Sequence, residues 1–184
     1  MSPILGIWAS QNYLRNPLNG FVSISTVTVG AGGASSITFS GIPQVYKHLQ
    51  IRAIASGAGA QRYGVQFNGD TGANYTQHFL YGTGSVAGAG GTVGGAKYNT
   101  IGASDGSTAF GASVTDILDY TNTNKNTTVR SLAGYDTNGA GLVVLYSFVW
   151  LNTSAVTSLT IQAAESYSGN FAQYSSFALY GIQG

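Results

Sequence analysis

The sequence contains no cysteine, only three prolines and few charged residues. Without cysteine the chain can form neither disulfide bonds nor thiolate metal sites, so packing and strand pairing alone must hold its fold together. Charged residues make up 7% of the chain, against about 25% in an ordinary globular domain. The surface must therefore consist largely of Ser, Thr, Asn, Gln and Gly. The formal net charge of the chain is only +1.

Clusters of basic residues and long apolar runs are also missing. The seven Lys and Arg residues are scattered singly from Arg15 to Arg130, so no basic patch is present to hold phosphates and nucleic-acid binding is disfavoured. The longest apolar run, residues 142–151 (LVVLYSFVWL), is too short for a helix that spans a bilayer. We expect no membrane insertion, and the first residues lack the basic start and long apolar core of a secretory signal.

The residues that are abundant favour a β fold. Hydrophobic residues make up 43% of the chain and aromatic residues 12%, which is enough to bury a core in one domain. Short stretches of alternating apolar and polar residues recur between turns rich in Gly, Asn and Ser, and no stretch has helical periodicity. We predict an all-β fold, an antiparallel two-sheet sandwich with a jelly-roll-like arrangement, over residues 21–184.

The clearest hairpin is predicted over residues 114–135, where two alternating arms flank the turn-forming segment TNTNKN. Asp116 lies on the first arm and Arg130 on the second, and a cross-strand ion pair would account for both. Asp116 and Asp119 are three residues apart, which places them on opposite faces of a strand. They are therefore not expected to act as a facing pair of catalytic carboxylates.

Three other stretches carry specific expectations. Residues 21–39 predict a hairpin closed by a turn at Gly30–Gly33. Residues 82–96 hold seven glycines and no charge, which favours a surface excursion, either ordered at a subunit contact or loose at an exposed tip. The unbroken apolar run at residues 142–151 predicts a strand buried on both faces, near the middle of a sandwich or between subunits.

No motif for catalysis or metal binding is present. The chain has two histidines, His48 and His78, and we interpret each as a strand histidine rather than a base or a ligand. The sequence contains no H-x-x-x-H and no G-x-S-x-G. We therefore expect no catalytic residues, no cofactor and no metal, and a protein that is not an enzyme.

The first 20 residues form a separate arm in this interpretation. Ile4, Leu5, Ile7 and Trp8 make a compact apolar patch close to the chain end, and such a patch is costly in water unless it docks on something. Two destinations remain open, namely the core of the arm's own domain and a partner protein. If the second holds, these four residues anchor the protein to a particle.

Five segments together resemble a family of small virion proteins of tailed bacteriophages. They are MSPILGIWAS at the start, SSITFSGIPQVYKHLQIRA at 35–53, FNGDTGANYTQHFLYG at 67–82, VTDILDYTNTNKNTTVRSLAGYDTNG at 114–139 and QYSSFALYGI at 173–182. The similarity covers nearly the whole chain except the glycine-rich region at 82–112. No set of functional residues comes with it.

The resemblance implies a β-sandwich module on the surface of the virion, often a homotrimer, without enzymatic activity. Two functions are compatible with it. The first is a capsid decoration or cement protein, or a tail-associated fibre or adaptor component, docked on other virion proteins through residues 1–20. The alternative is a receptor-binding module that contacts host glycan through the loops at residues 82–96, 121–128 and 136–141.

Overall fold

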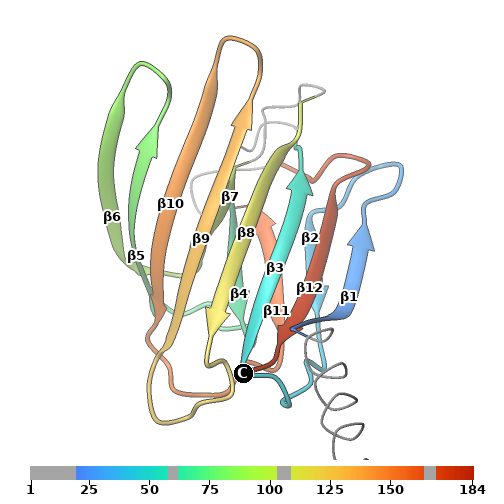
Figure 1. The fold of residues 1–184 in the computed structure, drawn as a ribbon, viewed down its shortest axis with the longest axis vertical. Helices are drawn as coiled ribbons and strands as arrows, with labels where there is room; N and C mark the ends of the chain where they lie inside the picture. Colours follow the sequence, from blue (N-terminus) through green and yellow to red (C-terminus); the bar gives the residue numbers. More distant parts are fainter. Residues whose placement is uncertain (1–19, 58–61, 103–108, 164–168) are drawn as a thin grey trace, which may run out of the picture.

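In a computed structural model, the protein is a sandwich of two antiparallel β-sheets (Figure 1). The structure describes residues 20–57, 62–102, 109–163 and 169–184. The larger sheet contains, in spatial order, β1 (Phe21–Thr28), β12 (Ser176–Ile182), β3 (His48–Ala55), β8 (Gly111–Leu118), β9 (Thr127–Asp136), β10 (Gly141–Trp150), β5 (Tyr75–Gly82) and β6 (Ala87–Gly95). The smaller sheet contains β2 (Ser36–Phe39), β11 (Leu159–Ala163), β4 (Arg62–Phe67) and β7 (Tyr98–Gly102).

The strand order is that of a jelly roll with two added hairpins. The chain alternates between the sheets, so that β1-β12-β3-β8 face β2-β11-β4-β7. These eight strands build the two interleaved Greek keys of a jelly roll. The hairpins β5-β6 and β9-β10 both extend the larger sheet beyond β8. The predicted two-sheet antiparallel sandwich is thus confirmed, and the described residues include no helix with the length and apolar character that a membrane crossing requires.

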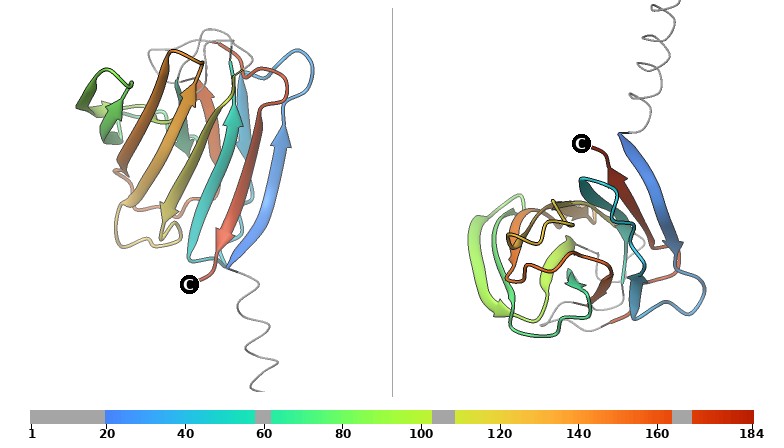
Figure 2. Two further views of the ribbon diagram at one scale, coloured as in Figure 1. Left: turned by 45° about the horizontal axis from the view of Figure 1, so that its top comes forward. Right: turned by 90° about the horizontal axis from the view of Figure 1, so that it is seen from below.

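The core lies between the sheets and is rich in aromatic side chains. Figure 2 shows the larger sheet curving around the smaller one, with β7 packed against β8, β9, β10 and β5. Trp150 is buried between Phe67 and Tyr75, and its Nε1 donates a hydrogen bond of 2.7 Å to Oδ2 of Asp70. Burial raises the pKa of Asp70, but hydrogen bonds from Trp150, Asn74 and the Gly72 amide outweigh it, so the net pKa is lowered.

The hairpin predicted over residues 114–135 is confirmed as β8 and β9, which pair from Ala112–Gly134 to Leu118–Thr128. The hairpin predicted over residues 21–39 is wrong. β1 pairs with β12 and β2 pairs with β11, because the segment that contains Gly32 and Gly33, both with positive φ, carries the chain from one sheet to the other. Turn chemistry predicts a change of direction but does not choose the partner strand.

The glycine-rich segment is also different from its prediction. Residues 87–95 form β6 at one edge of the larger sheet instead of a loop. Gly88 and Gly90 pair with Tyr81 and Phe79 on β5, and the two aromatic rings lie where side chains on these glycines would be. A β-carbon on Gly90 would come within 2.6 Å of the Phe79 ring. The glycines are therefore sites over which aromatic rings of the neighbouring strand fold, as in the aromatic rescue of edge glycines.

We predict that Gly90→Val lowers the free energy of unfolding by about 1–3 kcal/mol, because the ring of Phe79 has to leave its place beside Tyr146. Urea unfolding followed by tyrosine and tryptophan fluorescence measures the effect. The matched control is Ala89→Val, whose side chain is exposed on the opposite face of the same strand and should leave stability within about 0.5 kcal/mol. Equal losses in both variants would contradict this account of the glycines.

Candidate functional site

The outer face of the larger sheet, which points away from the smaller sheet, carries an unusual band of aliphatic side chains. Six large aliphatics on five adjacent strands are between 42% and 62% exposed: Ile54, Leu80, Val114, Leu132, Val143 and Leu145. We call these residues the outer apolar band. Single exposed aliphatics are ordinary, whereas a contiguous group of them marks an interaction surface.

The register of the sheet makes the band contiguous. Val114 lies opposite Leu132, Leu132 lies opposite Leu145, and Leu145 lies opposite Leu80. Side chains at directly paired positions on one face have their β-carbons roughly 4.5–5.5 Å apart, so these four form an unbroken row. Ile54 and Val143 lie in the next row, where Ala112 and Gly134 separate them.

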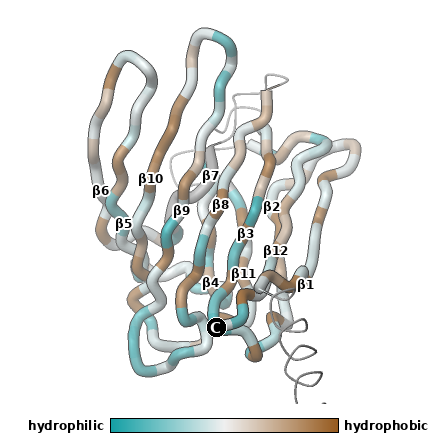
Figure 3. The backbone as a smooth tube through the Cα atoms, viewed as in Figure 1, coloured by the Kyte–Doolittle hydropathy of each residue, from teal (hydrophilic) through white to brown (hydrophobic). Residues whose placement is uncertain are grey.

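The band exists because apolar side chains lie on both faces of β10, and Figure 3 shows hydrophobic residues along this strand. Its inward side chains, Leu142, Val144, Tyr146, Phe148 and Trp150, are buried in the core. Val143 and Leu145 point outward and remain exposed. The prediction of a strand buried on both faces is therefore wrong within one chain: only the inner face is covered, and the prediction of burial between subunits is untested.

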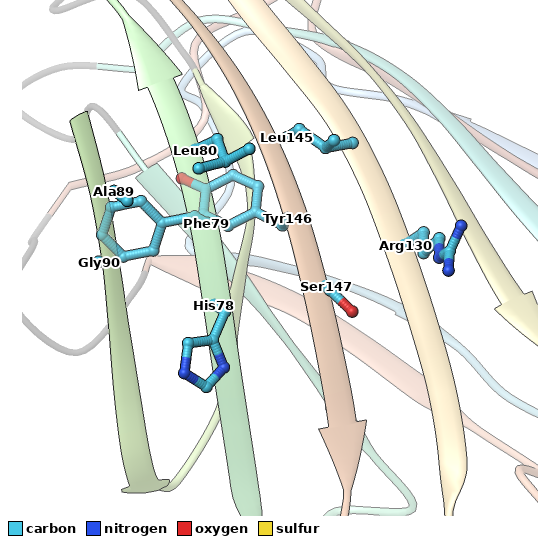
Figure 4. Close-up of a pocket in the computed structure, with 9 residues that line it drawn as sticks. All are labelled: His78, Phe79, Leu80, Ala89, Gly90, Arg130, Leu145, Tyr146 and Ser147. Atoms are coloured by element: carbon cyan, nitrogen blue, oxygen red, sulfur yellow. The ribbon is translucent and has the colours of Figure 1, made fainter. Parts of the chain in front are cut away.

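Two hollows interrupt the band. One, of about 360 Å³, surrounds Gly134 and is lined by Ala112, Val114, Leu132 and Val143 among others. The other, of about 470 Å³, lies between β5, β10 and β9, with Leu80 and Leu145 at one end and His78, Ser147 and Arg130 at the other (Figure 4). Both are open depressions in the face of a sheet rather than enclosed cavities.

A polar row borders the band on the same face. It runs through Gln50, Asp116, Arg130, Ser147 and His78, which are paired in this order across the strands. The ion pair predicted between Asp116 and Arg130 does not form, although the two residues lie directly opposite each other. Asp116 instead accepts a hydrogen bond of 2.7 Å from the side-chain amide of Gln50, which in turn accepts one from Arg52.

His48 belongs to a structural charge cluster at the end of β8. Its Nδ1 accepts a hydrogen bond of 2.9 Å from the backbone amide of Asp119, in keeping with its interpretation as a strand histidine. The Asp119 carboxylate binds the ammonium groups of Lys125 and Lys47, the latter at 3.0 Å. Hydrogen bonds from Lys125 and Lys47 lower the pKa of Asp119 to about 2. The cluster ties β3, β8 and the loop after β8 together. His78, by contrast, is exposed on β5.

The three loops predicted as a receptor surface do not come together. The turns at residues 82–86 and 137–140 share one end of the larger sheet and line a hollow of about 550 Å³, whereas the loop at residues 119–126 lies at the opposite end (Figure 1). The four predicted anchoring residues, Ile4, Leu5, Ile7 and Trp8, lie outside the described residues. No group of three or more potential metal ligands occurs within the described ranges.

Sequence reasoning missed the outer apolar band as a site. The signal was present in residues 142–151, where polar residues would be expected at every second position of a strand with one solvated face. A comparison with known protein-family models gave no match, and a comparison with curated protein sequences gave none either. The function has to be inferred from the fold and surface of this chain.

We predict that Asp119→Asn destabilises the protein in a pH-dependent manner. The pKa of Asp119 in the folded protein, about 2, lies below the usual value of 3.8 for an aspartate, so its carboxylate stabilises the fold above pH ~4 and this contribution is lost as the pH falls to ~2. Urea unfolding of both proteins between pH 6 and pH 2 should show a difference that shrinks in this window. A Lys125→Gln variant should show part of the same effect, and a difference that is independent of pH would contradict the assignment.

Proposed function

We propose that this protein is a non-enzymatic structural component of a phage particle surface, either a capsid decoration or cement protein or a tail-associated fibre or adaptor component. The observation that supports this most directly is the outer apolar band. A domain that acts alone in solution gains nothing from six half-exposed aliphatics in contiguous positions, whereas a subunit of an assembly buries them.

Two further properties fit a virion protein. The jelly roll agrees with the β-sandwich that the resemblance to phage virion proteins implies, although a fold alone does not assign a function. With 7% charged residues, contacts of this surface should depend little on ionic strength. In this proposal the partners are other virion proteins and further copies of the chain, with a homotrimer as the arrangement that the resemblance implies, and residues 1–20 attach the domain to the particle.

We predict that the double substitution Ile7→Ser and Trp8→Ser abolishes attachment to the particle, because it replaces two of the four side chains of the apolar patch, among them its tryptophan, with polar ones. The measurement is cosedimentation of the full-length variant with phage particles prepared without the endogenous protein. Val45→Ser is the matched control, since Val45 is a highly exposed aliphatic in a loop of the domain.

The thermal midpoint of the arm variant decides how a loss of binding is understood. An unchanged midpoint together with lost cosedimentation supports anchoring through the arm. Full cosedimentation of the arm variant, or an equal loss in the Val45→Ser control, would contradict it. A large fall in the midpoint would place Ile7 and Trp8 in the domain core instead.

A receptor-binding module is the second candidate, and one observation favours it. Two of the three loops proposed for glycan contact meet at one end of the larger sheet and line a shared hollow that includes Thr83, Tyr135 and Asp136. Hydroxyl, phenol and carboxylate groups around a shallow depression are suited to hydrogen bonding and stacking with a sugar. The loop at residues 119–126 is too far along the sheet to take part.

If this end of the sheet binds host glycan, Ala140→Trp should abolish binding by filling the hollow. The Ala140 side chain is exposed, and only its backbone carbonyl takes part in the hydrogen bonds of the turn. Binding to whole host cells and to a glycan array measures the effect. Asn124→Trp, at the opposite end, is the control, and unaltered binding by Ala140→Trp would exclude this hollow as the receptor site.

A further inference from the structure

We infer that the outer apolar band is the contact surface for a second copy of this chain, with two molecules packed outer face against outer face. The band runs across β3, β8, β9, β10 and β5, in the middle of the larger sheet rather than at an edge. Such a contact rests on the proposed structural role and specifies it further, because it names the partner and the surface that the partner covers. It joins chains in pairs and is therefore a different contact from those that would build the homotrimer.

The side chains of β10 indicate that this face is covered. A strand with apolar residues on both faces is typical of sheets that are buried on both sides, and β10 is such a strand. Its inner face is buried in the core, while Val143 and Leu145 are 62% and 50% exposed in the single chain. Their neighbours Leu132 and Leu80, which belong to different strands, are aliphatic as well. A second apolar layer over this face would complete the apolar environment for which these three strands are patterned.

The area of the face suits a stable contact between two domains. Five strands about 4.8 Å apart and eight residues long give a projected area of roughly 24 by 27 Å, or about 650 Å², before the relief of the side chains is added. A stable interface covers about 800 Å² on each partner, with an apolar centre and a polar rim. The outer apolar band would be the centre, and the row from Gln50 to His78 would form part of the rim.

The charges on this face favour an identical partner. Arg130 is exposed, and no carboxylate pairs with it within the described part of the chain. Asp116, directly opposite it on β8, is partly exposed. A two-fold axis that runs along the strands between β8 and β9 would place each Arg130 over Asp116 of the second copy, so that the same ion pair forms twice. The same axis places Val114 over Leu132 and Ile54 over Val143 of the second copy, so these aliphatic side chains meet aliphatic side chains. It also brings Leu145 over the strand position of Arg52.

The charge of Arg52, on the same face, is directed away from the contact. Arg52 lies in the same row as Val114, but its guanidinium lies over the rings of Phe21 and Tyr180, at 5.0 and 5.2 Å from their centroids. It also donates a hydrogen bond to Gln50. These contacts hold the Arg52 charge towards β1 and β12, so it need not be buried unpaired between two copies.

The test is the native mass of the full-length protein by sedimentation equilibrium, for the wild type and for Leu132→Glu. We expect the wild type to associate through pairs of chains, and Leu132→Glu to weaken this association at least tenfold, because two carboxylates would enter the centre of the contact. Val45→Glu, which adds the same charge at an exposed aliphatic outside the sheet, should associate like the wild type. Circular dichroism and the thermal midpoint show whether each variant is folded, and Leu145→Ser replaces Leu132→Glu if the latter fails to fold.

A charge exchange tests the proposed two-fold axis. Arg130→Asp should weaken association at least tenfold, and Arg130→Asp combined with Asp116→Arg should restore it, because each new arginine again faces an aspartate of the second copy. Failure of the double exchange to restore association would overturn this axis. A wild-type monomer would overturn the self-contact itself, as would a trimer or other oligomer that Leu132→Glu leaves intact.

The role of the arm is separated by one more variant. Ile7→Ser with Trp8→Ser should leave the association unchanged, since the arm takes no part in this contact, and a loss of association would assign the contact to the arm and overturn the inference. Neither measurement requires a phage particle. A protein that pairs through its outer face but never binds particles would therefore refute the proposed role and keep the contact. A protein that binds particles but does not pair would refute the contact and keep the proposed role.

Discussion

The burial of alternate side chains on β10 is the interaction on which the rest of the larger sheet depends. Five inward side chains of this strand, from Leu142 to Trp150, pack into the core. β10 pairs with β9 on one side and β5 on the other over nearly its whole length. It thereby joins the hairpin β5-β6 to the rest of the larger sheet. Trp150 also holds the loop before β5 through its hydrogen bond to Asp70.

The outer apolar band follows from the same constraint. Because side chains alternate strictly across a strand, commitment of Val144 and Tyr146 to the core forces Val143 and Leu145 to the opposite face. The neighbouring strands place Leu132, Val114 and Leu80 in register beside Leu145. A soluble sheet with one solvated face would carry polar residues at these positions. In our proposal, another apolar surface covers this face of the sheet.

An uncharged polar exterior and an apolar sheet face together favour a structural role over a catalytic one in our proposal. The clusters of polar and charged residues that the structure does form have structural tasks. The Asp119 cluster connects β3 with β8, and Asp70 organises the loop around Gly72 and Asn74. In a chain without cysteine, such hydrogen-bonded anchors supplement packing as the means of holding loops in place.

Composition and alternation determined the class of this protein, the existence of most of its strands and the hairpin of β8 and β9, because these depend on neighbours in sequence and on turn chemistry. Pairing between distant strands could not be obtained in this way. β1 joins β12, and β2 joins β11, because the closure of two sheets over one core selects partners by geometry and not by sequence proximity.

The glycines of β6 indicated a loop until the rings of Phe79 and Tyr81 supplied the missing side chains from β5. The outer apolar band also depends on the tertiary structure. Residues 142–151 predicted an apolar strand, but only the register of five strands placed the outward residues of β10 beside those of the neighbouring strands.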